Sequence, residues 1–170
     1  MLGVIAVLGW LLLAAALPDL LPDRLGLMHA GPDLWVALVV YLACRGRGYA
    51  AVGWAVVVGV CRDVQSLDPL GTHAFVLGLV ALVFAEGARD RGRVGAGTRA
   101  ACLLAGGVLA AWAYTLRMLP LGGGLSGRDL LSAFPAAAWT VVAAAPLYAI
   151  SDALRLFDDV LGRRRHGLPA

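Results

Sequence analysis

Stretches of apolar residues alternate with short polar or glycine-rich segments along the whole chain. The apolar stretches cover residues 1–17, 32–44, 49–64, 72–87, 98–119 and 133–157. A helix that crosses a bilayer needs about 20 mostly apolar residues. The second stretch reaches that length only if it begins near residue 25, and the third only if it continues to residue 67. The pattern predicts an all-α polytopic bundle of six transmembrane helices that forms one domain over residues 1–170.

The composition agrees with lipid as the solvent of this chain. Hydrophobic residues make up 61% of it and charged residues only 15%, and the mean hydropathy is +0.82. Soluble domains are about half apolar and a quarter charged, so a soluble protein of 170 residues is excluded. The net charge of +3 is small and its arginines lie between apolar stretches, which argues against nucleic-acid binding.

The arginines predict the orientation in the membrane. With six helices and a cytoplasmic N-terminus, nine arginines lie in the cytoplasmic segments, namely Arg45, Arg47, Arg89, Arg91, Arg93, Arg99, Arg163, Arg164 and Arg165. Four lie on the outer side, namely Arg24, Arg62, Arg117 and Arg128. Cytoplasmic loops are enriched in positive residues, so both termini are expected in the cytoplasm. The basic C-terminal tail is expected to touch anionic membrane lipid.

The densest polar segment, residues 59–73, joins the third and fourth predicted helices. Arg62 and Asp63 are adjacent, so on a helix they point about 100° apart and each needs a partner elsewhere. Asp33, at the start of the second helix, is expected at a similar depth and could meet Arg62. These charges either face the bundle interior or a polar cavity, or lie in water at the headgroup level.

A turn is predicted between these two helices. Pro69 fixes its own φ and Gly71 permits a positive φ before the fourth helix. Thr72 is a candidate N-cap of that helix, and His73 follows it. A metal site at His73 would need Asp63 and Asp68 as further ligands, which is a weak set.

Small residues recur at four-residue spacing, as in Gly106 with Ala110 and Gly107 with Ala111. Such faces let helices approach closely in lipid. They serve either a seam with another protein or packing within the bundle, and we interpret them as internal packing.

Catalysis and cofactors find little support in the sequence. The segment 124–127 has a Gly-x-Ser-Gly pattern like that of rhomboid proteases, but the one histidine downstream, His166, is predicted on the opposite side of the membrane. Ser66, Asp68 and His73 crowd one turn without an evident oxyanion site. Asp152 is expected to pair with Arg155, and no phosphate-binding, dinucleotide, haem or iron–sulfur motif is present. We therefore expect no enzyme activity, cofactor or metal.

One part of the sequence resembles a known family, the bacterial rod shape-determining protein MreD. The resemblance lies in residues 32–80. It rests on Pro32-Asp33-Leu34, the apolar helix to Tyr41, the basic hairpin 45–48, the Gly59-x-x-x-Asp63 run, and Pro69-Leu70-Gly71-x-His73-Ala74. Arg62 departs from this pattern, in which an apolar or aromatic residue is expected.

The resemblance implies a non-enzymatic scaffold in the cell-elongation complex of the inner membrane. The implied partners are MreC, the glycosyltransferase RodA, a class B penicillin-binding protein and the actin-like MreB, with no nucleic acid. Asp33, Gly59, Arg62, Asp63, Pro69, Gly71 and His73 would form a structural or interaction motif. The alternative function is a substrate-binding subunit of an energy-coupling-factor vitamin transporter, in which the polar residues would converge on a cavity.

Overall fold

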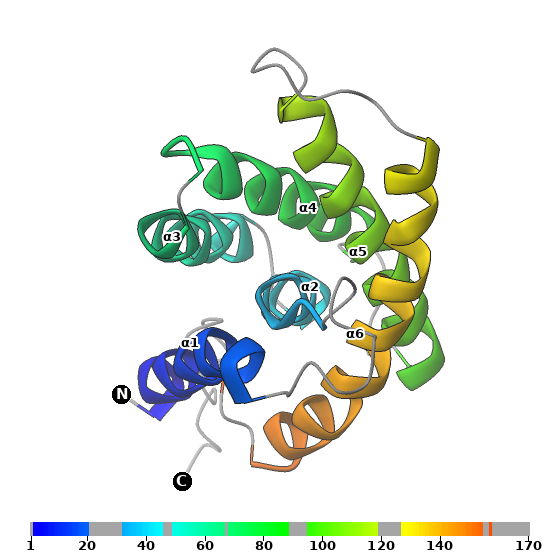
Figure 1. Cartoon of the computed structure of the whole chain (residues 1–170). Helices are drawn as coiled ribbons and strands as arrows, with labels where there is room; N and C mark the ends of the chain where they lie inside the picture. The colour runs from blue at the N-terminus through cyan, green and yellow to red at the C-terminus, as the bar shows by residue number, and fades with distance from the viewer. Residues whose placement is uncertain are drawn as a thin grey trace, which may run out of the picture.

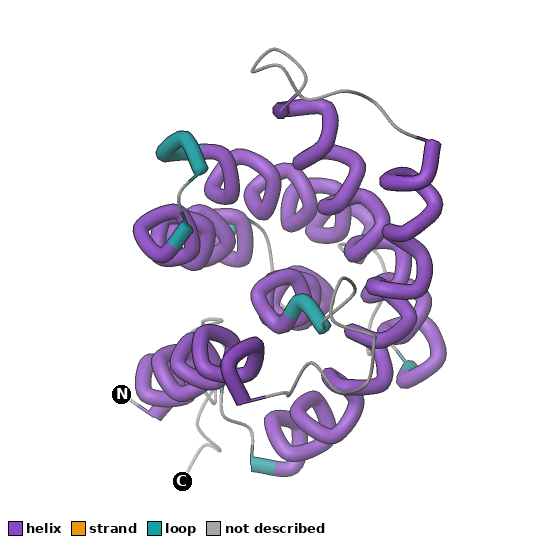
Figure 2. The backbone as a smooth tube through the Cα atoms, in the orientation of Figure 1, coloured by secondary structure: helices purple, strands orange, loops and turns teal. Residues whose placement is uncertain are grey.

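The structure, a computed structural model, describes residues 2–20, 32–45, 49–66, 68–88, 95–118, 127–154 and 157. These residues form six helices: α1 (Leu2–Leu20), α2 (Leu34–Arg45), α3 (Ala50–Gln65), α4 (Thr72–Ala88), α5 (Ala96–Met118) and α6 (Gly127–Ala153). Figure 2 shows helices and short turns, with no strand in the described part of the chain. The predicted all-α fold with six helices is confirmed.

Five helices agree closely with the predicted boundaries, and the sixth does not. The prediction placed it at 133–157, whereas α6 begins at Gly127 and ends at Ala153. Polar residues before 133 favoured a loop there. However, a helix is held by its own backbone hydrogen bonds and can continue beyond the apolar layer. Pro135 and Pro146 lie inside α6, where each removes one backbone hydrogen bond.

Helix α2 lies at the centre of the molecule. In Figure 1 the other helices surround it, and it contacts each of the other five. All its residues from Leu34 to Ala43 are buried. Because α2 is apolar on every side, other helices can enclose it without burying unpaired polar side chains, which is compatible with its central position.

Small residues mediate close contacts between helices. A Cβ added at Gly107 would lie 2.8 Å from Cβ of Ala137 on α6. One added at Gly106 would lie 2.6 Å from Cγ2 of Val40 on α2. These faces therefore serve packing within the bundle, as predicted.

An aromatic cluster attaches α1 to the rest of the molecule. The ring of Trp10 lies 6.2 Å from that of Tyr41, 6.0 Å from that of Tyr148 and 6.2 Å from that of Phe157, measured between centroids. Its indole nitrogen donates a hydrogen bond to the carbonyl of Leu34 at 3.1 Å. The N-terminal helix and a residue beyond α6 therefore meet on the surface of α2.

The outer surface carries many large apolar side chains. Leu12 is 72% exposed, and Phe75 and Leu131 are 61% and 69% exposed. So much exposed apolar surface is unfavourable in water and suits contact with lipid. Within the described residues, segments 96–116 and 131–153 are each long and apolar enough to cross a membrane. The full set of six spans and the cytoplasmic termini stay predictions.

Candidate functional site: the joint between α3 and α4 and the cavity beside it

Gly59 brings α3 against the first turn of α4. A Cβ at this position would lie 2.6 Å from the backbone nitrogen of Ala74 and 2.8 Å from the carbonyl carbon of His73. Real Cβ atoms do not approach other atoms so closely, so only glycine fits here without a shift. Asp63 lies one turn further along the same face of α3. The close approach at Gly59 thus places the Asp63 carboxylate beside the N-terminus of α4.

Asp63 caps α4 from the neighbouring helix. Its Oδ1 accepts the backbone N–H of His73 at 2.8 Å, and its Oδ2 accepts those of Gly71 at 3.0 Å and Ala74 at 3.2 Å. The first amides of a helix have no partner within the helix and carry partial positive charge, so a carboxylate is well suited to them. Asp63 is buried, and these bonds compensate the loss of its hydration.

The prediction that Thr72 is the N-cap of α4 is wrong. The Thr72 hydroxyl donates to the carbonyl of Pro69 at 2.7 Å, so it closes the preceding turn instead. Gly71 adopts a φ of 90°, which confirms the positive φ expected there. With Pro69, it directs the chain into α4 so that the first amides face Asp63.

Arg62 and Asp33 form the ion pair that the sequence suggested. The Arg62 Nη1 lies 2.7 Å from Asp33 Oδ2, and both side chains are about a third exposed, at 28% and 31%. Asp33 also caps α2, because its Oδ1 accepts the backbone N–H groups of Trp35 and Val36, each at 3.1 Å. Its own backbone N–H donates to Thr140 Oγ1 on α6 at 2.8 Å. Asp33 therefore links α2, α3 and α6.

His73 lies between two carboxylates. Its Nδ1 is 3.0 Å from Asp63 Oδ1, and its Nε2 is 3.7 Å from Asp68 Oδ2. Tyr114 on α5 donates its hydroxyl proton to Asp68 Oδ1 at 2.9 Å. The rings of His73 and Tyr114 lie 5.5 Å apart. This arrangement extends the polar contacts from the joint to α5.

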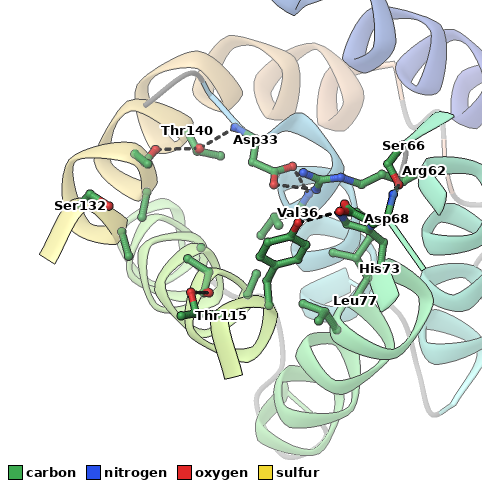
Figure 3. Close-up of a pocket in the computed structure, with 18 residues that line it drawn as sticks. Asp33, Val36, Arg62, Ser66, Asp68, His73, Leu77, Thr115, Ser132 and Thr140 are labelled. Carbon is green, nitrogen blue, oxygen red and sulfur yellow. Dashed lines mark hydrogen bonds and ion pairs between the residues drawn. The ribbon is translucent and has the colours of Figure 1, made fainter. Parts of the chain in front are cut away.

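A cavity of about 580 Å³ opens beside these residues. Figure 3 shows Asp33, Arg62, Asp68 and His73 grouped on one side, with Thr115 and Ser132 on the other. The remaining wall is made of small and aliphatic residues, among them Val36, Leu77, Gly107, Ala110, Ala111, Ala133, Ala136 and Ala137. Its volume lies in the usual range for small-molecule pockets.

The seven residues predicted from sequence divide into two groups. Asp33, Arg62 and His73 line the cavity. Gly59, Asp63, Pro69 and Gly71 shape the joint that positions them.

Sequence reasoning missed Tyr114 and Thr140 and considered Asp68 only as a metal ligand or triad member. The high density of polar residues around Asp68 was a usable signal. Tyr114 and Thr140 lie in mostly apolar helices far from Asp33 and Asp68 in sequence, and only the three-dimensional packing brings them to the cavity.

The residue types of a catalytic site are present, but their contacts differ from those of a triad. The Ser66 hydroxyl donates to the carbonyl of Asp63 and accepts the N–H of Asp68, so within the described residues it does not engage His73. No group of three potential metal ligands occurs in the described part of the chain. Residues 124–126 of the Gly-x-Ser-Gly pattern and His166 lie outside the described residues.

A second polar cluster lies where α2, α5 and α6 meet. Asp152 forms ion pairs with Arg45 and Arg99, and the Tyr41 hydroxyl donates to Asp152 Oδ1 at 2.7 Å. The partner predicted for Asp152, Arg155, lies outside the described residues. These contacts join helices that are distant in sequence.

Comparison with known proteins agrees with the resemblance seen in the sequence. Residues 1–119 match the family described as rod shape-determining protein MreD. The match covers the chain from its start to the end of α5, and so includes both the joint and Tyr114. No curated protein and no solved structure matches significantly. Because the matched segment is more than half of the chain, this protein belongs to the MreD family of membrane proteins and takes part in rod shape determination.

Proposed function

We propose that the protein is a non-enzymatic scaffold of the cell-elongation complex in the inner membrane. In this role it binds MreC and helps to position RodA and a class B penicillin-binding protein, with the actin-like MreB as a further partner. The observation that carries the proposal is the family match over residues 1–119, because the family acts in shape determination. A helical bundle with an apolar outer surface is also suited to holding the membrane helices of other proteins.

The joint supports this proposal because it gives the bundle a defined shape. Asp63 fixes α4 to α3, and Asp33 fixes α2 to α3 and α6. A scaffold needs such fixed geometry, since its partners are positioned by the surfaces that it presents. The joint itself needs no reactive group to perform this function.

Affinity purification of the tagged full-length protein from mildly crosslinked native membranes tests the scaffold. We expect mass spectrometry to find MreC and RodA-type proteins. The Asp63→Asn and Gly71→Ala variants should recover less of both, because each disturbs the joint. Gly53→Ala is the matched control, since a Cβ at Gly53 meets nothing within 4 Å. Recovery of neither partner by the unmodified protein would contradict the proposal.

A second candidate function is a substrate-binding subunit of an energy-coupling-factor vitamin transporter. The observation that favours it is the cavity, because Asp33, Arg62 and His73 converge on it, whereas a scaffold requires no such convergence. The same purification discriminates between the two functions. Recovery of ATPase subunits with a transmembrane coupling protein, in place of MreC and RodA, would establish the transporter subunit.

A further inference from the structure

A second cavity, of about 320 Å³, lies between the first half of α5 and the second half of α6. The first cavity lies beside the opposite halves of these two helices, which pack side by side (Figure 1). The described lining residues of the second cavity all belong to α5 and α6. On α5 they are Ala96, Arg99, Ala100 and Leu103, spaced three or four residues apart. The cavity is therefore a groove between one face of each helix.

The groove opens on the apolar outer surface of the bundle. Ala145 and Ala149 line it and are exposed, whereas Leu103, which also lines it, is only 2% exposed and lies at its base. Val142 and Ile150 on the same helix as the two alanines are 61% and 52% exposed. Apolar side chains exposed to this degree suit contact with lipid. An acyl chain of the surrounding bilayer can therefore enter the groove from the side.

The end of the groove nearest the start of α5 is polar and basic. Arg99 and Asp152 line it and form an ion pair with each other, and Arg45 at the end of α2 pairs with the same carboxylate. Two guanidinium groups thus converge on one carboxylate. The first turn of α5 is exposed and contains no acidic residue, and backbone N–H groups at the start of a helix attract anions.

The charges of the whole chain favour an anionic partner at this end. The nine arginines predicted on the cytoplasmic side, together with Arg155, are accompanied by five acidic residues, namely Glu86, Asp90, Asp152, Asp158 and Asp159. Arginines therefore outnumber acidic residues two to one on this side, whatever pairs they form. On the outer side, four arginines are accompanied by six aspartates, namely Asp19, Asp23, Asp33, Asp63, Asp68 and Asp129.

We propose that the groove between α5 and α6 binds an anionic phospholipid. One acyl chain lies along the small-residue groove, and the headgroup phosphate contacts Arg99 at the start of α5. A guanidinium has five N–H donors, so Arg99 can donate to a phosphate and to Asp152 together. The proposal goes beyond the scaffold function and holds equally for a transporter subunit, because it concerns only the lipid around these two helices.

Native mass spectrometry of the full-length protein in detergent micelles tests the headgroup preference. The protein is titrated with an equimolar mixture of palmitoyloleoylphosphatidylglycerol and palmitoyloleoylphosphatidylcholine, which have the same acyl chains and differ in net charge. We expect the protein to retain phosphatidylglycerol about fivefold more strongly, the effect of one arginine near an anionic headgroup. This readout is independent of the recovery of MreC and RodA, so one proposal can fail without the other.

One pair of variants connects the binding to the groove. Ala145→Leu places a larger side chain in the groove, and we expect it to lose more than half of the bound phosphatidylglycerol. Its melting temperature should not change, because Ala145 is exposed and a larger side chain there extends into the groove. Ala101→Leu is the matched control, since Ala101 is an exposed residue of α5 at the same end of the bundle and is not among the lining residues.

A second pair of variants connects the preference to the charge of Arg99. Arg99→Gln should retain phosphatidylglycerol and phosphatidylcholine equally, whereas Arg99→Lys, which keeps the charge, should still prefer phosphatidylglycerol. The ratio of the two lipids is the readout, because a purely structural role of Arg99 would lower the binding of both.

Three results would overturn the proposal. The first is equal retention of the two lipids by the unmodified protein. The second is an equal effect of Ala145→Leu and Ala101→Leu on phosphatidylglycerol binding, and the third is an unchanged lipid ratio in Arg99→Gln. The comparison of the two lipids needs no variant, so the test remains decisive if a variant does not fold.

Discussion

At the scale of single residues, one carboxylate organises the joint between α3 and α4. Asp63 receives four N–H groups, three from the backbone at Gly71, His73 and Ala74 and one from the His73 ring. Charge-assisted hydrogen bonds of this kind are about twice as strong as neutral ones. A helix end that is normally capped by a residue of its own chain segment is here capped by another helix.

Replacement of Asp63 by asparagine should lower stability. The new side chain would keep one acceptor oxygen, and its amide would face backbone N–H groups that also donate. Because hydrogen bonds to a charged group contribute about 1.5–3 kcal/mol each, we expect a loss of at least that size. Thermal unfolding in nanodiscs, followed by tryptophan fluorescence, measures it. Asp68→Asn removes the same charge nearby, but Asp68 accepts one hydrogen bond, from Tyr114, and asparagine keeps an oxygen that can accept it. The drop should therefore be smaller than for Asp63→Asn, and an equal drop in both variants would contradict the role of Asp63.

The sequence showed which residues require a hydrogen-bond or ion-pair partner more reliably than it showed which partner they have. Adjacent Arg62 and Asp63 had to find separate partners, and Asp33 was correctly expected for Arg62. Thr72 was wrongly expected to cap α4, because N-cap preferences describe neighbours in sequence and Asp63 reaches the helix through space. Asp152 shows the same limit, since its described partners Arg45 and Arg99 are far away in sequence.

At the scale of elements, the close approach of α3 and α4 depends on one missing side chain. Gly59 lies against the backbone of Ala74 and His73, and backbone atoms cannot rotate away as a flexible side chain can. The four-residue spacing of Gly59 and Asp63 was visible in the sequence. The sequence did not show that Gly59 contacts α4 and that Asp63, one turn later on the same face, caps it, because both contacts are made to a different helix.

Gly59→Ala should force the two helices apart and remove the cap. Overpacking costs about 1–3 kcal/mol, and weakened bonds at Asp63 add to it. Gly53→Ala on the same helix is the matched control, because its Cβ would meet nothing within 4 Å, and it should gain up to about 1 kcal/mol from better helix propensity. Both are measured by thermal unfolding in nanodiscs. Equal effects of the two substitutions would show that α3 does not depend on close contact at Gly59.

At the scale of the whole molecule, α2 holds the helices together and α1 depends on an aromatic contact with it. Trp10 packs on Tyr41, Tyr148 and Phe157, and it bonds the carbonyl of Leu34. Apolar stretches in the sequence were sufficient to find the helices. They did not show that α2 would be central, because all the helices that the structure describes are mostly apolar.

Trp10→Ala should detach α1 from the bundle. Loss of a large aromatic residue from a packed site costs about 3–5 kcal/mol. Leu8→Ala removes a residue of the same helix that is 54% exposed, and it should change stability little. Limited proteolysis in nanodiscs, together with thermal unfolding, reports the release of α1. Unchanged proteolysis of Trp10→Ala would show that other contacts hold α1.

The enclosure of α2 has a consequence for biogenesis. Its 12 residues extend about 18 Å, whereas the hydrocarbon layer is about 30 Å thick. Such a segment is a poor substrate for independent integration by the translocon. Of the five helices that surround it, α3, α4, α5 and α6 are synthesised after it. If α2 spans the membrane as predicted, we expect it to be incompletely shielded until these later helices emerge from the ribosome. It should then reach its final position late, by assembly of the helices, rather than early, by partition into lipid.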